Sequence, residues 1–115
     1  MIIKELCQQV YRTLGAGYSE RIYHNALEVL LRKNNINYET ERIIPITFQD
    51  HVIGNMRADL IINNELIVEI KAVKTFNQSM KTQLEKYRTL TGIHTGLLVN
   101  FPQPQTEECE FYVPS

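Results

Sequence analysis

The sequence predicts an α/β fold in which helices flank a central mixed sheet. Apolar residues recur every three or four positions in the first third of the chain and again over residues 76–91, which is the helical period. Between these segments the period changes to two, which predicts a meander of three strands. An apolar strand follows the last helix, so a crossover connection is expected. The 115 residues suit one domain spanning residues 1–115.

Two helices are expected before the first strand. The first spans residues 2–14, and the glycine-rich turn at 15–17 ends it. The second spans residues 20–33, with Ser19 as its cap. Glu20 lies at the margin of the apolar face of this helix. It either stabilises the helix N-terminus or points into a site between helix and sheet.

The meander should comprise strands at 38–48, 52–62 and 66–73. Pro45 suggests that the first strand lies at an edge of the sheet or carries a bulge, because proline cannot donate to a ladder. The third strand is strongly apolar yet carries Glu69 and Lys71, which share one face. These charges form either a solvated ion pair or a metal-binding carboxylate beside a catalytic lysine.

The loop between the second and third strands decides which residues face each other. A three-residue loop at 63–65 pairs Ile62 with Leu66 and places Asp59 opposite Glu69. A two-residue loop would instead place Asp59 opposite Val68. The longer loop is expected, and two carboxylates that close repel unless a cation or a shared proton intervenes.

The rest of the chain completes the sheet. Residues 76–91 form the third expected helix, residues 95–101 a buried strand, and residues 110–113 a short edge strand. The formal net charge of −1 argues against a broad basic surface, and no apolar stretch is long enough to cross a bilayer. With no secretory signal at the N-terminus and only Cys7 and Cys109 as thiols, a cytoplasmic protein is expected.

Two common types of site are disfavoured. His24, His51 and His94 could join the cysteines around zinc, but no pair has the short spacing of a structural zinc site. No nucleophile elbow of a serine or cysteine hydrolase is present.

Four short motifs lie on the expected elements. Asp59 is followed by Glu69-x-Lys71 across the hairpin, an arrangement that resembles the PD-(D/E)XK nuclease superfamily. The expected order of elements resembles the restriction-endonuclease-like α-β-β-β-α-β core of that superfamily. Gln83-x-x-x-Tyr87 resembles a motif of its RecB-like branch, and residues 17–23 read G-x-x-E-x-x-Y. The chain is therefore identified as a member of the GxxExxY protein family, although Ala58 stands where the superfamily name has proline.

The resemblance implies a nuclease that depends on Mg²⁺ or Mn²⁺ and hydrolyses phosphodiester bonds in DNA or RNA. By the match, Asp59 and Glu69 would be metal ligands together with the backbone carbonyl of Ile70. Glu20 would bind the metal directly or through water. Lys71 would orient the attacking water and stabilise the transition state.

The resemblance also implies supporting residues and partners. Gln83, Tyr87, Tyr23 and Lys74 would support the site or the substrate, although a surface amide and a packed tyrosine explain the first two equally well. Glu41 faces the same region if the register holds. A basic stripe could follow the third strand, formed by Lys71, Lys74, Lys81, Lys86 and Arg88.

The expected partner is nucleic acid, with DNA favoured over RNA, and no membrane. A homodimer would double any basic patch, although the sequence itself shows no dimer. The alternative is a catalytically silent nuclease-fold module that binds nucleic acid or a protein partner.

Overall fold

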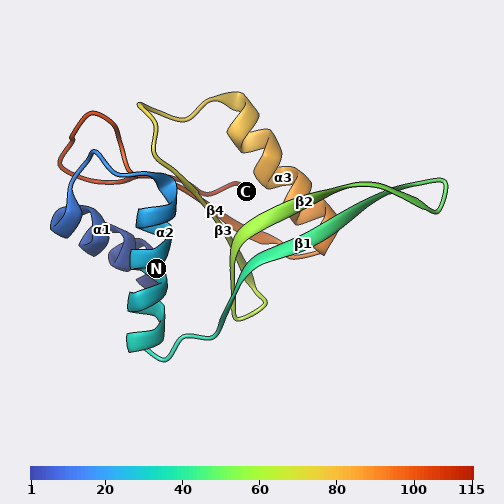
Figure 1. Cartoon of the computed structure of the whole chain (residues 1–115), viewed down its shortest axis with the longest axis horizontal. Helices are drawn as coiled ribbons and strands as arrows, with labels where there is room; N and C mark the ends of the chain where they lie inside the picture. Colours follow the sequence, from blue (N-terminus) through green and yellow to red (C-terminus); the bar gives the residue numbers. More distant parts are fainter.

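The structure, a computed structural model, describes residues 1–115. It contains three helices and five strands in one sheet (Figure 1). In chain order these are α1 (Ile2–Leu14), α2 (Glu20–Lys33), β1 (Tyr38–Phe48), β2 (His51–Ile62), β3 (Leu66–Lys71), α3 (Gln78–Thr91), β4 (Thr95–Asn100) and β5 (Glu110–Tyr112). No helix combines the length and the apolar character that crossing a bilayer requires.

The strands lie in the order β1-β2-β3-β4-β5. The β1–β2, β2–β3 and β4–β5 pairs are antiparallel, whereas β3 and β4 are parallel. Helix α3 connects the two parallel strands, as a crossover requires. The predicted meander, crossover and mixed sheet are confirmed.

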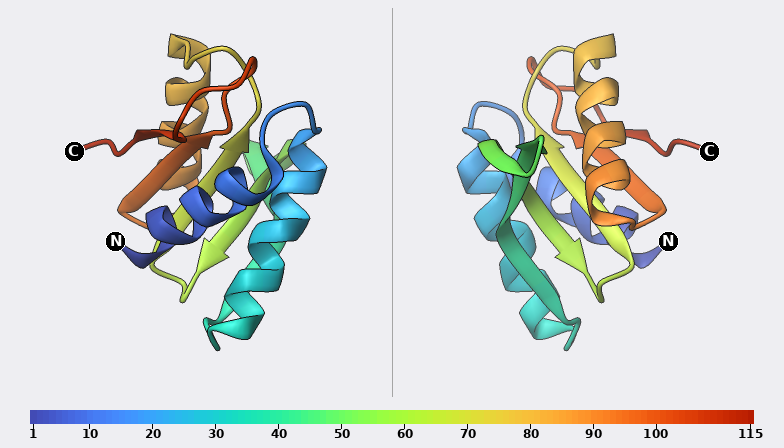
Figure 2. Two further views of the ribbon diagram at one scale, coloured as in Figure 1. Left: turned by 90° about the vertical axis from the view of Figure 1, so that its left-hand side faces the viewer. Right: turned by 90° about the vertical axis from the view of Figure 1, so that its right-hand side faces the viewer.

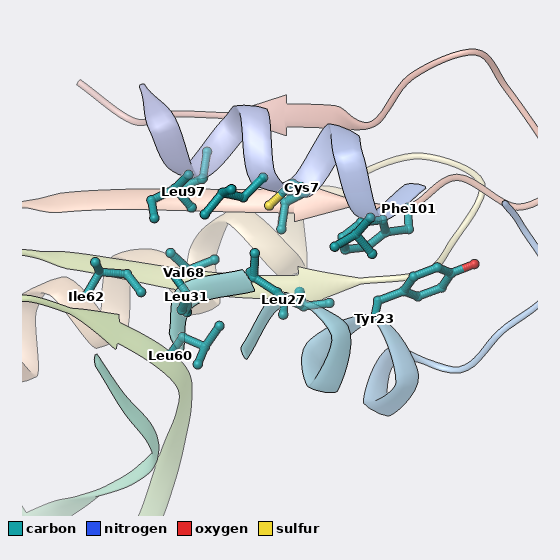
Figure 3. Close-up of a cluster of buried hydrophobic side chains, with 14 of the residues drawn as sticks. Cys7, Tyr23, Leu27, Leu31, Leu60, Ile62, Val68, Leu97 and Phe101 are labelled. Atoms are coloured by element: carbon teal, nitrogen blue, oxygen red, sulfur yellow. The ribbon is translucent and has the colours of Figure 1, made fainter. Parts of the chain in front are cut away.

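Helices cover both faces of the sheet (Figure 2). Helices α1 and α2 pack on one face around a cluster of 16 buried hydrophobic residues (Figure 3). Helix α3 packs on the other face, around a cluster of 8. Because alternate residues of a strand point to opposite faces, Val68 and Ile70 join the first cluster and Ile67 joins the second. Glu69 shares the face of Ile67.

The predicted elements agree with the structure to within two residues at each end, and the two largest shifts have visible reasons. Strand β3 ends at Lys71 rather than at Val73, because the Asn100 side chain takes the place of a ladder partner. Its Oδ1 accepts from Val73 N–H at 2.8 Å and its Nδ2 donates to Val73 O at 2.9 Å. Helix α3 begins at Gln78 rather than at residue 76, because Asn77 Oδ1 caps it by accepting from Met80 N–H at 2.9 Å.

The distal part of the β1–β2 hairpin projects away from the rest of the molecule (Figure 1). We call residues 43–56 the arm. A register shift between Ile46 and Thr47 marks a β-bulge in it. β1 lies at the edge of the sheet, which confirms the position expected from Pro45. The radius of gyration of 14.3 Å exceeds the roughly 13 Å of a compact chain of this length.

Candidate active site

The β2–β3 hairpin has the predicted register. Ile62 pairs with Leu66 across a three-residue loop, and the last ladder pair before the site is Leu60 with Val68. Asn63 and Asn64 have positive φ angles of 51° and 57°, which asparagine tolerates better than most residues. The loop therefore places Asp59 and Glu69 next along the two strands, as expected.

Beyond this last pair, the two strands are joined by carboxylates instead of by the ladder. The backbone N–H of Asp59 donates to Glu69 Oε1 at 3.0 Å. The backbone N–H of Ile70 donates to Asp59 Oδ2 at 2.8 Å. Each acid thus accepts a hydrogen bond from the neighbouring strand. One oxygen of each carboxylate makes this bond.

The electrostatic environment of Glu69 is unfavourable to its charge. Its side chain is 4% exposed. Burial, followed by the nearby charge of Asp59, raises its pKa well above the usual range, and Lys71 opposes this only in part. On the same face, burial and the two carboxylates raise the pKa of Tyr87 to about 12. A divalent cation would relieve this repulsion, so the donor set fits such an ion.

Asp59 also lines a pocket of about 250 Å³ between α2 and the sheet. The other lining residues are Glu20, Arg21, His24 and Ile70. The predicted ligand Glu20 therefore shares a pocket with Asp59, whereas Glu69 and Lys71 do not line it. No three acidic, histidine or cysteine side chains are gathered around one point. Of the expected donors, Glu20, Asp59 and Ile70 thus line one pocket, whereas Glu69 contacts Asp59 from outside its lining.

Two lining residues were not assigned to the site from the sequence. Arg21 forms an ion pair with Glu41 of β1. His24 is buried, with Nε2 at 3.0 Å from Glu28 Oε2 and 2.9 Å from Thr40 Oγ1. Glu20 and His24 are four residues apart on one helix, and this spacing was the signal that could have placed His24 beside the acid.

Tyr23 supports the loop before Glu20 rather than lining the pocket. It is fully buried, stacks on Phe101 at 4.4 Å between ring centroids, and points its hydroxyl toward the loops (Figure 3). That hydroxyl donates to Gly15 O at 2.7 Å and accepts from Gln103 Nε2 at 3.2 Å. Gln103 Oε1 in turn accepts from Gly17 N–H at 2.7 Å. The loop that precedes Glu20 is thereby fixed to the segment after β4.

The predicted residues of α3 are placed against the sheet. Tyr87 donates its hydroxyl proton to Arg57 O at 2.6 Å, two residues before Asp59. Gln83 Nε2 lies 3.4 Å from the same hydroxyl. Tyr87 therefore holds the strand that carries Asp59, and Gln83 borders it.

The residues of the expected basic stripe differ in their contacts. Lys71 is half-buried at the end of β3, and Lys74 is exposed in the following loop. Lys81 lies over the Tyr112 ring at 4.7 Å. Arg88 binds Glu85 and the carbonyl of His94, so its charge is already matched. Lys86 is exposed on α3.

A mixed sheet between two helical layers, with an acidic pair where β2 and β3 part, defines the restriction-endonuclease-like class of α/β proteins. The chain belongs to the PD-(D/E)XK nuclease superfamily, whose family model matches residues 1–111. A solved structure titled "Crystal structure of SSO0001" is similar, with a TM-score of 0.62 and 29% sequence identity over 82% of this chain. This chain spans 48% of that one, about half its length. No curated protein matches.

Proposed function

We propose that this protein is a nuclease that requires Mg²⁺ or Mn²⁺ and hydrolyses phosphodiester bonds. The observation that carries the proposal is that the Asp59 and Glu69 carboxylates each accept a backbone N–H of the opposite strand where β2 and β3 part, with Lys71 two residues further along β3. Membership of the nuclease superfamily supports it. Oxygen donors of this kind suit Mg²⁺ and Mn²⁺.

Metal binding and catalysis would be carried out by different residues of the site. Asp59 and Glu69 would hold the ion through their second oxygens, with the Ile70 carbonyl beside them and Glu20 from across the pocket. When bound, the ion supplies Lewis-acid polarisation of the phosphate and lowers the pKa of water. Lys71 would orient the attacking water and stabilise charge on the phosphate. Lys74, exposed in the next loop, would contact the substrate backbone.

The finer assignments are also proposals. Glu20 begins α2 and Tyr23 anchors the glycine loop before it, an arrangement that supports membership of the GxxExxY family. Gln83 and Tyr87 support a place in the RecB-like branch. The free thiols of Cys7 and Cys109 fit a reducing compartment, so we propose a cytoplasmic protein that acts as one domain. DNA is the proposed substrate, in preference to RNA.

One observation favours a second candidate, a catalytically silent module that binds nucleic acid or a protein partner. Both carboxylates already accept backbone N–H groups, and Glu69 is nearly inaccessible. Acids in that position also serve to join two strands that have left their ladder. Metal binding decides between the two candidates.

The deciding measurement is Mn²⁺ binding by calorimetry, with Asp59→Asn and Asp59→Ala as variants. Wild type should bind the ion, Asp59→Asn should bind it at least tenfold more weakly, and Asp59→Ala should not bind it. Asparagine can still accept from Ile70 N–H, so loss of affinity in this variant cannot be attributed to a broken hairpin. Glu107→Ala, in an exposed loop, is the surface control. Absence of binding by wild type, both alone and with a DNA oligonucleotide, would favour the silent module.

A further inference from the structure

The pocket that contains Asp59 has a single cationic side chain that is always charged. Arg21 lines it together with Glu20, His24 and Asp59. Its side chain is 58% exposed, so its guanidinium can meet a ligand that enters from solvent. In the structure, Arg21 pairs with Glu41 of β1. This contact joins α2, which lines the pocket, to the edge strand β1.

Glu41 holds this position with an unfavourable backbone. Its φ angle is 55°, although it lies within a strand between the Thr40–Leu60 and Arg42–Ala58 pairs. A left-handed conformation is uncommon for a residue with a side chain, and such residues concentrate at binding sites and switch regions. The ion pair with Arg21 is the contact that the Glu41 side chain makes in this conformation.

We propose that Arg21 binds a phosphate group of the substrate and that Glu41 occupies Arg21 until the substrate arrives. This rests on the proposed function, because it names the group that receives the phosphate in the same pocket. The guanidinium fork fits a carboxylate and a phosphate equally well, so a phosphate can replace Glu41 without leaving the arginine unpaired. Release of Glu41 also lets its backbone relax. Without Arg21, a pocket that contains Glu20 and Asp59 repels an anion.

The alternative role for this ion pair is a structural one, as a clip between α2 and β1. The two roles predict different changes in anion affinity when Glu41 is removed. If Glu41 competes with phosphate, its removal raises the fraction of Arg21 that is free and therefore raises the affinity for an anion. If the pair is only a clip, removal of either partner breaks the same contact and shifts the affinity in the same direction.

The first test is binding of a fluorescein-labelled DNA duplex in Ca²⁺, followed by anisotropy over a salt series. Arg21→Gln should weaken binding about tenfold and reduce the salt slope by about one. Glu41→Gln should tighten binding severalfold. Arg32→Gln is the matched control, because Arg32 lies on the same helix, is 60% exposed and pairs with Glu28 outside the pocket; its affinity should equal that of wild type.

A second readout does not depend on nuclease function. Inorganic phosphate, without metal, should raise the Tm of wild type, raise that of Glu41→Gln further, and leave that of Arg21→Gln unchanged. If this order holds while wild type neither binds DNA nor cleaves it, the anion site stands and the proposed function fails. If wild type binds and cleaves DNA while Arg21→Gln and Glu41→Gln shift affinity in the same direction, the inference about Arg21 is wrong.

Discussion

At the scale of single residues, Glu69 is a carboxylate whose environment opposes its own charge. It is buried, and its closest charged neighbour is another acid. A buried carboxylate of this kind destabilises the folded protein when it ionises, because the unfolded chain can leave it in water. If a cation binds there, it relieves the unfavourable free energy of the ionised Glu69 in the metal-free protein, and this relief strengthens binding of the cation.

The charge of Glu69 predicts how stability depends on pH without metal. Its pKa is raised on folding, so its stabilising contribution is complete below its unfolded pKa of about 4.3 and is lost as the pH rises through the folded pKa. In a buffer that contains a metal chelator, the free energy of unfolding of Glu69→Gln should therefore increase relative to that of wild type as the pH rises. Each pKa unit of the shift is worth about 1.4 kcal/mol at high pH. Urea unfolding at about pH 5 and about pH 8 measures the difference.

Two controls make that result specific to the acidic pair. Glu110→Gln changes a half-buried carboxylate that accepts from Thr75 and Asn100 and has no acidic neighbour at β2; it should show no such gain. Saturating Mn²⁺ should make wild type more stable than Glu69→Gln, since only wild type keeps the Glu69 carboxylate as a metal ligand. A Glu69→Gln variant that is equally destabilised at both pH values would contradict the prediction.

Lys71 should separate chemistry from binding. It follows Glu69 on β3 and is half-buried. Lys71→Ala should reduce cleavage by at least a hundredfold because its charge stabilises the transition state. It should leave the Mn²⁺ affinity within about threefold of wild type, because it supplies no ligand oxygen. Lys86→Ala, on the exposed face of α3, should change neither quantity. Cleavage retained in Lys71→Ala would remove this lysine from the proposed mechanism.

At the scale of elements, the loop between α1 and α2 is held by Tyr23. Tyr23→Phe keeps the ring on Phe101 but leaves Gly15 O and Gln103 without the hydroxyl. We expect a loss of about 1–2 kcal/mol in the free energy of unfolding. The Mn²⁺ affinity should also fall, since Glu20 follows this loop. Tyr18→Phe is the control, because the exposed Tyr18 hydroxyl makes no hydrogen bond. Equal stability of the two variants would mean that the hydroxyl does not hold the loop.

Helical and strand periods sufficed to predict the elements from the sequence, because most of them pack apolar residues into the two core clusters. Strand β5 and most of β1 bury no regular apolar face. The loop at 63–65 also predicted the contact between Asp59 and Glu69, because loop length sets the register. The end of β3 was not predictable, since it depends on Asn100, which is 29 residues away along the chain. The Arg21–Glu41 pair was equally out of reach, because it depends on the left-handed backbone of Glu41.

At the scale of the whole molecule, the arm projects away from the sheet and the helices (Figure 1), and several of its large apolar side chains are not buried by them. The four most exposed large hydrophobic side chains of the chain lie on it, at 58% to 65% exposure: Ile43, Phe48, Val52 and Ile53. Asp50 is the only residue of the arm that is charged at neutral pH. An apolar surface without cations is poorly suited to a phosphate backbone and well suited to another apolar surface. We therefore propose that any contact between two copies of this chain is made by the arm.

The area of the arm limits how strong this dimer can be. Each of the four side chains offers on the order of 100 Å², so two copies would bury about 800 Å². That is below the roughly 1,000 Å² expected of a stable specific interface, and Pro45 lacks the N–H that pairing of two β1 edges would use. We expect packing of arm against arm, with a dissociation constant in the micromolar range or weaker.

Sedimentation over a concentration series tests this arrangement. Wild type should pass from monomer to dimer at micromolar to submillimolar concentrations. The double variant Phe48→Thr/Val52→Thr should stay monomeric, because threonine keeps the preference for strands while removing apolar area. Val29→Thr, a similar change on the exposed side of α2, should dimerise like wild type. Phe48 and Val52 lie near the turn of the arm, at least seven residues before Asp59, and neither is a proposed ligand, so the double variant should keep its Mn²⁺ affinity. A wild type that remains monomeric throughout the series would exclude self-association through the arm and leave it as a surface for a different protein.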